Sequence, residues 1–90
     1  SSFFEKFINY ENKNILVYGV KAPKNREISG VVLRLVNISG EQQNTTIKSS
    51  IPFSTYRELN ALEEIISENH DLKSEISFKP HELKTLRFLC

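Results

Sequence analysis

The sequence predicts an all-β protein, a small antiparallel β-sandwich of immunoglobulin-like architecture. Short segments rich in β-branched and aromatic residues recur at about 8–12-residue spacing, which is typical of a sandwich. Polar stretches with Gly, Pro or Asn separate them. In the last segment, Leu86 and Phe88 alternate with Thr85 and Arg87, as a strand with one buried face requires.

Length and composition indicate one domain, residues 1–90. The hydrophobic fraction of 39% and the charged fraction of 26% exclude a disordered chain. The net charge is +1 and basic residues occur singly, so we expect no nucleic-acid partner. We also expect no membrane partner, because no apolar run approaches the roughly 20 residues of a spanning helix. The single cysteine, Cys90, and the lack of a leader favour a cytoplasmic location and a bacterial source.

The first expected strand is 14–21, followed by a polar loop at 22–27 that contains a proline. The next strand, 28–36, is apolar on both faces, so it is expected to lie centrally in a sheet. Arg34 interrupts one of these faces and needs either a partner or access to solvent.

Two hairpins are expected. A tight Asn- and Gly-containing turn at 37–41 precedes a mostly polar strand, 42–51, which we pair with 28–36. Residues 76–78 and 83–89 form the second candidate pair, and Pro80 lies in the break between them.

Residues 56–67 are ambiguous. Leu59, Leu62, Ile65 and Ile66 follow a helical spacing, and the segment is rich in helix-forming residues. The pattern taken alone predicts a capped helix, whereas the strands around it favour another extended segment.

No catalytic constellation is present in the sequence. His70 and His81 lack metal-ligand spacing, and we interpret them as solvated loop residues. Glu63 and Glu64 are adjacent, so they point in different directions and are interpreted as surface charge. Aromatic residues near the N-terminus, among them Tyr18, could stack on a sugar, although core packing is the commoner role.

Four segments resemble the C-terminal β-domain of the glycoside hydrolase family 38 α-mannosidases. These are 14–21, Val32-Leu-Arg-Leu-Val-Asn-Ile-Ser-Gly-Glu41, Tyr56-Arg-Glu-Leu-Asn-Ala-Leu-Glu-Glu64 and the closing Phe78-Lys-Pro-His-Glu-Leu-Lys-Thr-Leu-Arg-Phe88. The likeness spans residues 14–90, and residues 1–13 form a leading segment. The last match is the most specific, although His81 stands where phenylalanine is common. The resemblance implies that residues 56–64 are extended within a sandwich.

The resemblance also implies a parent enzyme that hydrolyses terminal α-mannosides with retention. Its nucleophile and a zinc ion would belong to another domain, so no catalytic or metal-binding residue, and no cofactor, is assigned to this chain. The implied partners are the remaining domains of the parent chain and an α-mannoside substrate. Polar residues in the matched segments are the candidate interdomain or substrate-cleft contacts: Arg34, Asn37, Glu58 and Glu63. Alternatives are a free-standing carbohydrate-binding or adhesive module and a structural linker domain.

Overall fold

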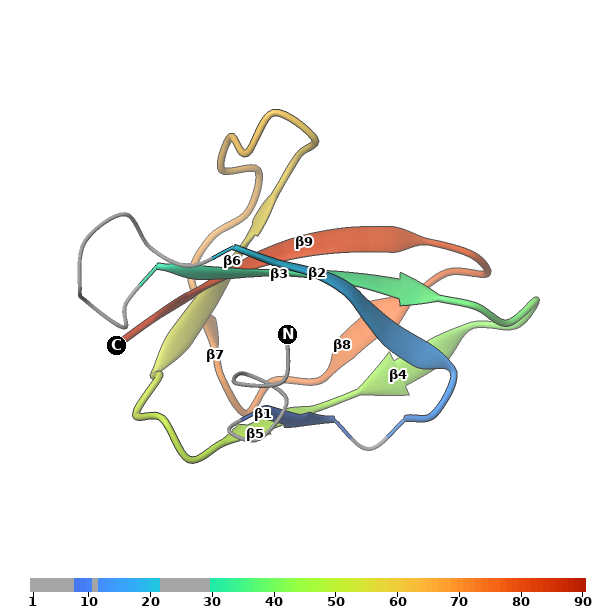
Figure 1. The fold of residues 1–90 in the computed structure, drawn as a ribbon, viewed down its shortest axis with the longest axis horizontal. Helices are drawn as coiled ribbons and strands as arrows, with labels where there is room; N and C mark the ends of the chain where they lie inside the picture. Colours follow the sequence, from blue (N-terminus) through green and yellow to red (C-terminus); the bar gives the residue numbers. More distant parts are fainter. Residues whose placement is uncertain (1–7, 11, 22–29) are drawn as a thin grey trace.

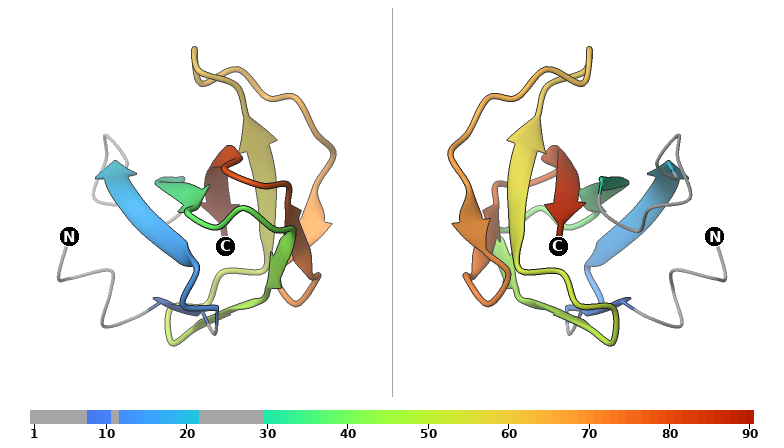
Figure 2. Two further views of the ribbon diagram at one scale, coloured as in Figure 1. Left: turned by 90° about the vertical axis from the view of Figure 1, so that its right-hand side faces the viewer. Right: turned by 90° about the vertical axis from the view of Figure 1, so that its left-hand side faces the viewer.

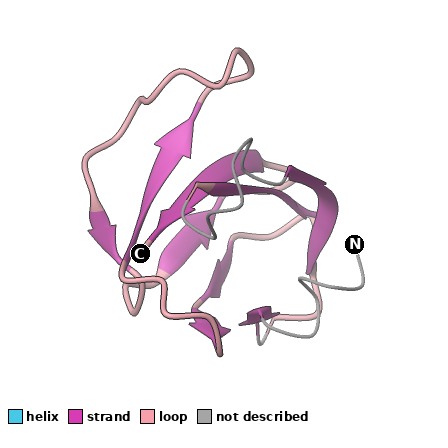
Figure 3. Ribbon diagram, turned by 60° about the vertical axis from the view of Figure 1, so that its left-hand side comes forward, coloured by secondary structure: helices cyan, strands magenta, loops and turns pink. Residues whose placement is uncertain are grey.

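The structure is a computed structural model, which describes residues 8–10, 12–21 and 30–90. Throughout these residues the regular structure is extended, without a helix (Figure 3). The strands are β1 (Ile8–Tyr10), β2 (Ile15–Lys21), β3 (Val31–Asn37), β4 (Gln43–Thr45), β5 (Ile47–Ser49), β6 (Thr55–Leu59), β7 (His70–Asp71), β8 (Ile76–Phe78) and β9 (Leu83–Leu89). The predicted all-β class is confirmed.

The strands form two layers of a small sandwich (Figure 1). One layer is a five-stranded sheet of order β2-β3-β9-β6-β7, and the other contains the pairs β1-β5 and β4-β8. All pairings are antiparallel. The expected central position of β3 is confirmed, and β9 likewise has a strand on each side. Both edges of β9 are therefore hydrogen-bonded to neighbouring strands, so neither is open to aggregation through strand pairing.

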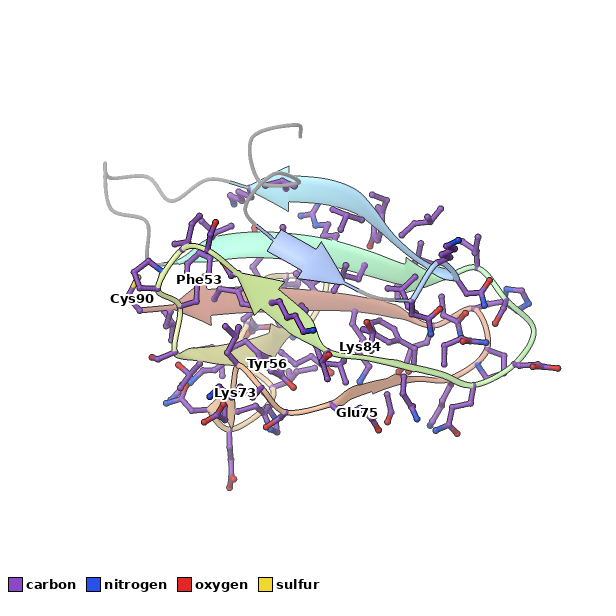
Figure 4. All side chains as sticks on the ribbon, turned by 90° about the horizontal axis from the view of Figure 1, so that it is seen from below. Phe53, Tyr56, Lys73, Glu75, Lys84 and Cys90 are labelled. Atoms are coloured by element: carbon purple, nitrogen blue, oxygen red, sulfur yellow. The ribbon has the colours of Figure 1, made fainter. Side chains whose placement is uncertain are left out.

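The core lies between the layers, and its position follows from strand register. Val31 pairs with Phe88, and Leu33 pairs with Leu86, so these side chains share the inner face. All four are buried, as is Phe78 from the opposite layer. Phe88 is also in ring contact with Phe53 at 5.6 Å and with Tyr56 at 6.0 Å between centroids. Figure 4 labels Phe53 and Tyr56. These contacts place Phe88, near the C-terminal end of β9, among the aromatic rings of the core.

Both expected hairpins are wrong. β3 pairs with β2 and β9, while segment 42–51 divides into β4 and β5, which pair with β8 and β1 in the other layer. β8 and β9 likewise belong to different layers. Alternation in a sequence predicts which side chains face the core, but it does not specify which strand lies alongside. Residues 28 and 29 of the expected strand and the expected loop 22–27 lie outside the described residues.

The helix that the pattern taken alone predicts at 56–67 does not form. The extended segment that the resemblance implies at 56–64 is confirmed only in its first part, as β6 (Thr55–Leu59). After Leu59 the chain turns sharply and returns, with an isolated bridge from Leu59 to Ile65. The Asn60 side chain explains the turn, because its Oδ1 accepts hydrogen bonds from the backbone N–H groups of Leu62 and Glu64, each at 2.9 Å. Asn60 thus closes a loop that helix propensity alone would not form.

We call residues 58–67 the projecting hairpin, because they extend away from the sandwich on the outer side of the five-stranded sheet (Figure 2). Of its four apolar residues at helical spacing, only Leu59 is buried. The other three, Leu62, Ile65 and Ile66, are 80%, 48% and 56% exposed. The apolar pattern in this segment therefore does not mark a core face.

Candidate functional site

Exposed apolar side chains of the described residues gather on one side of the molecule. Apart from Ile38, those that are large lie either on the outer face of the five-stranded sheet or on the projecting hairpin. They are Leu16, Tyr18, Leu62, Ile65, Ile66 and Leu83. Single exposed apolar residues are ordinary, but a cluster on one face is typical of an interaction surface.

Strand register joins some of these residues into a row. Leu16 on β2 lies opposite Val36 on β3, and Val36 lies opposite Leu83 on β9. Directly opposed side chains on one face are close enough to touch. The row crosses three strands, and Leu16 and Leu83 are 44% and 60% exposed. We call it the apolar row.

A groove of about 550 Å³ lies between the apolar row and the projecting hairpin. Tyr18, Leu83 and Ile66 contribute its main apolar lining. Arg34 and Thr85, which oppose each other across β3 and β9, contribute polar groups. Its volume and mixed lining match those of small-molecule sites, which are commonly about 300–1,000 Å³.

Arg34 faces outward by the alternation of β3, and a β-bulge in β2 places Gly19 beside it. The register shifts between Val17 and Gly19, so Tyr18 is the extra residue. A Cβ atom built on Gly19 would lie 3.4 Å from Cδ of Arg34, so the arginine stem passes over the glycine. The side chain of Arg34 is exposed and has no hydrogen bond or ion pair with the described part of the chain. Exit to solvent, one of the two alternatives expected, is the arrangement observed.

Glu58 and Lys84 also line the groove, but their register with Leu86 and Leu35 directs both side chains to the inner face of the sheet, where they form an ion pair. Glu58 Oε1 lies 3.1 Å from Lys84 Nζ, and the two side chains are 28% and 19% exposed. The Lys84 ammonium also lies 5.7 Å from the centroid of the Phe78 ring (Figure 4). Because each charge has the other as its partner, the pair adds little net charge to the groove.

Glu63 connects the projecting hairpin to the end of β2. Its carboxylate accepts hydrogen bonds from Lys21 Nζ at 2.8 and 3.1 Å. This hydrogen bond lowers the pKa of Glu63 below its ordinary value, against a smaller opposing effect of desolvation, and the charges of Lys21, Arg34 and Arg87 add to the lowering. The ion pair is a surface contact between the hairpin and the end of β2.

Asn37 lies in the interior and not in the groove. Its side chain is fully buried, and Nδ2 donates to the carbonyls of Glu41 at 2.8 Å and Lys79 at 3.0 Å. Its Oδ1 accepts from the N–H and Oγ of Ser39, both at 2.9 Å. Both ends of the amide are therefore engaged within the domain, where they join the turn after β3 to the end of β8.

The structure thus brings Arg34 and Glu58 to one groove, places Glu63 at the hairpin tip and separates Asn37 from all three. Sequence reasoning did not select Leu83, Thr85 or Ile66 as site residues. Leu83 and Thr85 occupy the alternate positions to Leu86 and Phe88 on β9, so period-two counting places them outward. Ile66 gave no such signal, because its segment read as a helix.

Tyr56 is a titratable group in the core whose pKa departs from its ordinary value. Burial raises that pKa above 10.0, and the negative charge of Glu58 raises it further. The folded chain then holds the phenolic proton more tightly than the unfolded chain. We expect the unfolding free energy to fall as pH rises above 10.0 and through the folded-state pKa. Denaturant unfolding across this range should show a steeper fall for the unsubstituted chain than for Tyr56→Phe, and equal slopes would contradict the prediction.

Groups of three or more His, Cys, Asp or Glu side chains that could hold a metal ion are absent from the described ranges. His70 stacks on Tyr56 with 5.2 Å between ring centroids, and His81 is exposed in the turn before β9. The residues that the structure describes form no helix with the length and apolar character needed to span a membrane.

Comparison with known proteins identifies the family. Residues 14–86 match the family described as the glycosyl hydrolases family 38 C-terminal beta sandwich domain. Searches of curated proteins and of solved structures gave no match. The match covers most of the chain and agrees with the two-layered fold described above. The chain therefore belongs to the family of C-terminal β-sandwich domains of glycosyl hydrolases family 38.

Proposed function

We propose that this chain is the non-catalytic C-terminal β-sandwich of an α-mannosidase, and that it packs against the catalytic part of the parent enzyme and stabilises it. The family membership of the chain supports a family 38 glycosyl hydrolase as the parent enzyme. The observation that carries the packing role is the one-sided distribution of exposed apolar side chains. An isolated sandwich would place polar residues on the outer face of its sheet.

The contact surface in this proposal comprises the apolar row and the tip of the projecting hairpin. Leu62 is 80% exposed, although the turn that presents it is held by the Asn60 hydrogen bonds. An exposed apolar residue on an ordered turn loses little conformational entropy when a partner covers it. Covering a leucine of this kind stabilises an interface by about 1.5–3 kcal/mol.

The packing role is tested in the full-length enzyme with Leu62→Asp and Ile65→Asp. We expect each substitution to lower the thermal stability of the enzyme but to leave the melting temperature of the 90-residue chain nearly unchanged, because both side chains are exposed in it. Ser77→Asp, at an exposed position on β8 in the other layer, is the matched control. Equal stability of the full-length variants and the control would overturn the packing role.

The non-catalytic assignment has its own test. The 90-residue chain is expected to release no product from an aryl α-mannoside, with or without added zinc. A retaining glycosidase needs two carboxyl groups about 5–5.5 Å apart across the scissile bond. In the groove, Glu58 is already paired with Lys84, and Glu82 Oε1 accepts a hydrogen bond from the backbone N–H of Lys79 at 2.8 Å. Zinc-dependent or zinc-independent turnover would refute the assignment.

A further inference from the structure

We infer that the groove beneath the projecting hairpin is a binding site for a single pyranose unit, with Tyr18 as the stacking surface and Arg34 as the hydrogen-bond donor. The ligand class follows from the chemistry of the groove. The choice of an α-mannoside as the first probe rests on the proposed function.

The apolar wall of the groove suits one face of a sugar ring. Tyr18 is 51% exposed, and it lines the groove together with Leu83 and Ile66. A pyranose has a face of C–H groups that packs against an aromatic ring, whereas its hydroxyl groups point outward from the ring edge. A tyrosine held on a strand provides this contact with little loss of side-chain freedom.

The polar lining suits the hydroxyl groups. Arg34 has five N–H donors in a planar fork, and among the described residues none accepts a hydrogen bond from them. The Thr85 hydroxyl, opposite Arg34, can both donate and accept. Glu82 also lines the groove, and its Oε2 has no hydrogen-bond partner in the described structure. Donors and acceptors are thus present together, as a polyol requires.

The charge balance favours a neutral ligand over an anion. The residues that line the groove include two basic ones, Arg34 and Lys84, and two acidic ones, Glu58 and Glu82. Glu58 and Lys84 neutralise each other in an ion pair on the inner face of the sheet. A site for phosphate or carboxylate would hold an excess of donors and positive charge. Here the positive charge of Arg34 is balanced by the Glu82 carboxylate, which would repel an anion but can accept a hydrogen bond from a sugar hydroxyl.

The site is also held in place. The Lys21–Glu63 ion pair joins the hairpin to β2, and the backbone N–H of Glu58 on β6 donates a hydrogen bond to the Ser67 hydroxyl oxygen at 2.8 Å. The Asn60 hydrogen bonds order the turn between them. A groove whose two walls are fixed before binding avoids part of the entropic cost of ordering them.

The test is a titration of the 90-residue chain with methyl α-mannoside, followed by amide chemical shifts in NMR spectra. We expect saturable shifts near Tyr18, Arg34 and Thr85, with a Kd on the order of 1 mM, as is typical of a one-ring ligand. Tyr18→Ala and Arg34→Ala should each weaken binding at least about tenfold, which corresponds to about 1.4 kcal/mol. Tyr18→Phe should retain binding, because the stacking ring remains.

Matched controls separate the groove from the rest of the outer face. Leu16→Ala removes an exposed apolar side chain from the same strand, and Arg87→Ala removes a guanidinium from the same face; neither residue lines the groove. Both variants should bind as the unsubstituted chain does. Dispersed amide spectra verify that each variant is folded.

Three results would overturn the inference. They are absence of saturable shifts with methyl α-mannoside and methyl α-glucoside at tens of millimolar, equal loss of binding in the control variants, and saturable binding of inorganic phosphate to the groove in place of a glycoside. None of them bears on the packing role, which the Leu62 and Ile65 variants test in the full-length enzyme. Loss of the packing role would in turn leave sugar binding by the isolated chain measurable.

Discussion

Replacing Phe88 by alanine is expected to lower the free energy of unfolding by about 3–5 kcal/mol. Phe88 is fully buried, and it is in contact with rings on either side of it, Phe53 and Tyr56. It also lies on β9, which pairs with both β3 and β6. The substitution would therefore leave a cavity against a central strand of the five-stranded sheet. A domain of this size has about 5–15 kcal/mol of stability in total, so much of it would be lost.

Urea denaturation followed by circular dichroism measures this effect. Leu83→Ala is the matched control, since Leu83 lies on the same strand but is 60% exposed. We expect the control to change stability by no more than about 0.5 kcal/mol. Similar losses in the two variants would mean that β9 does not bury its Phe88 face, contrary to the described register.

Replacing Asn37 by alanine is expected to cost roughly 2–3 kcal/mol. The substitution would leave the carbonyls of Glu41 and Lys79 without their side-chain donor, and the N–H of Ser39 without its acceptor. These bonds connect the turn that leaves β3 to the end of β8, so their loss would loosen the contact between the two layers. A buried polar group left unpaired costs more than an exposed hydrogen bond contributes.

Asn37→Asp refines this prediction, because it keeps the Oδ1 acceptor but removes the Nδ2 donor. It should also destabilise the domain, since a carboxylate oxygen would face two carbonyls in a buried site. Asn44→Ala, at an exposed position on β4, is the control and should be nearly neutral. Thermal unfolding of the three variants measures the differences. An Asn37→Ala variant as stable as Asn44→Ala would show that the interior network is not needed for the fold.

These two residues illustrate why the candidate site was only partly predictable. Asn37 and Arg34 come from the same matched segment, but they are three positions apart on β3, so their side chains point to opposite faces of the sheet. Arg34 is on the outer face and reaches the groove past Gly19, whereas Asn37 is enclosed by the turn and β8. The sequence shows that the two residues lie on one strand. It does not show that β8, whose Phe78 is 41 positions further along the chain, encloses one of them.

The sequence by itself determined the class of the fold, the central position of β3 and the inward face of β9. These properties depend on alternation and on β-branched content, which act within a strand and are therefore local. Only the tertiary structure decided which strands pair, because register across layers depends on which apolar faces can be buried together. It also decided the form of residues 56–67, where Asn60 and the bridge from Leu59 to Ile65 outweigh a helical spacing. Helix propensity differs by only a few tenths of a kcal/mol per residue. The pairing of β6 with β9 therefore outweighs it.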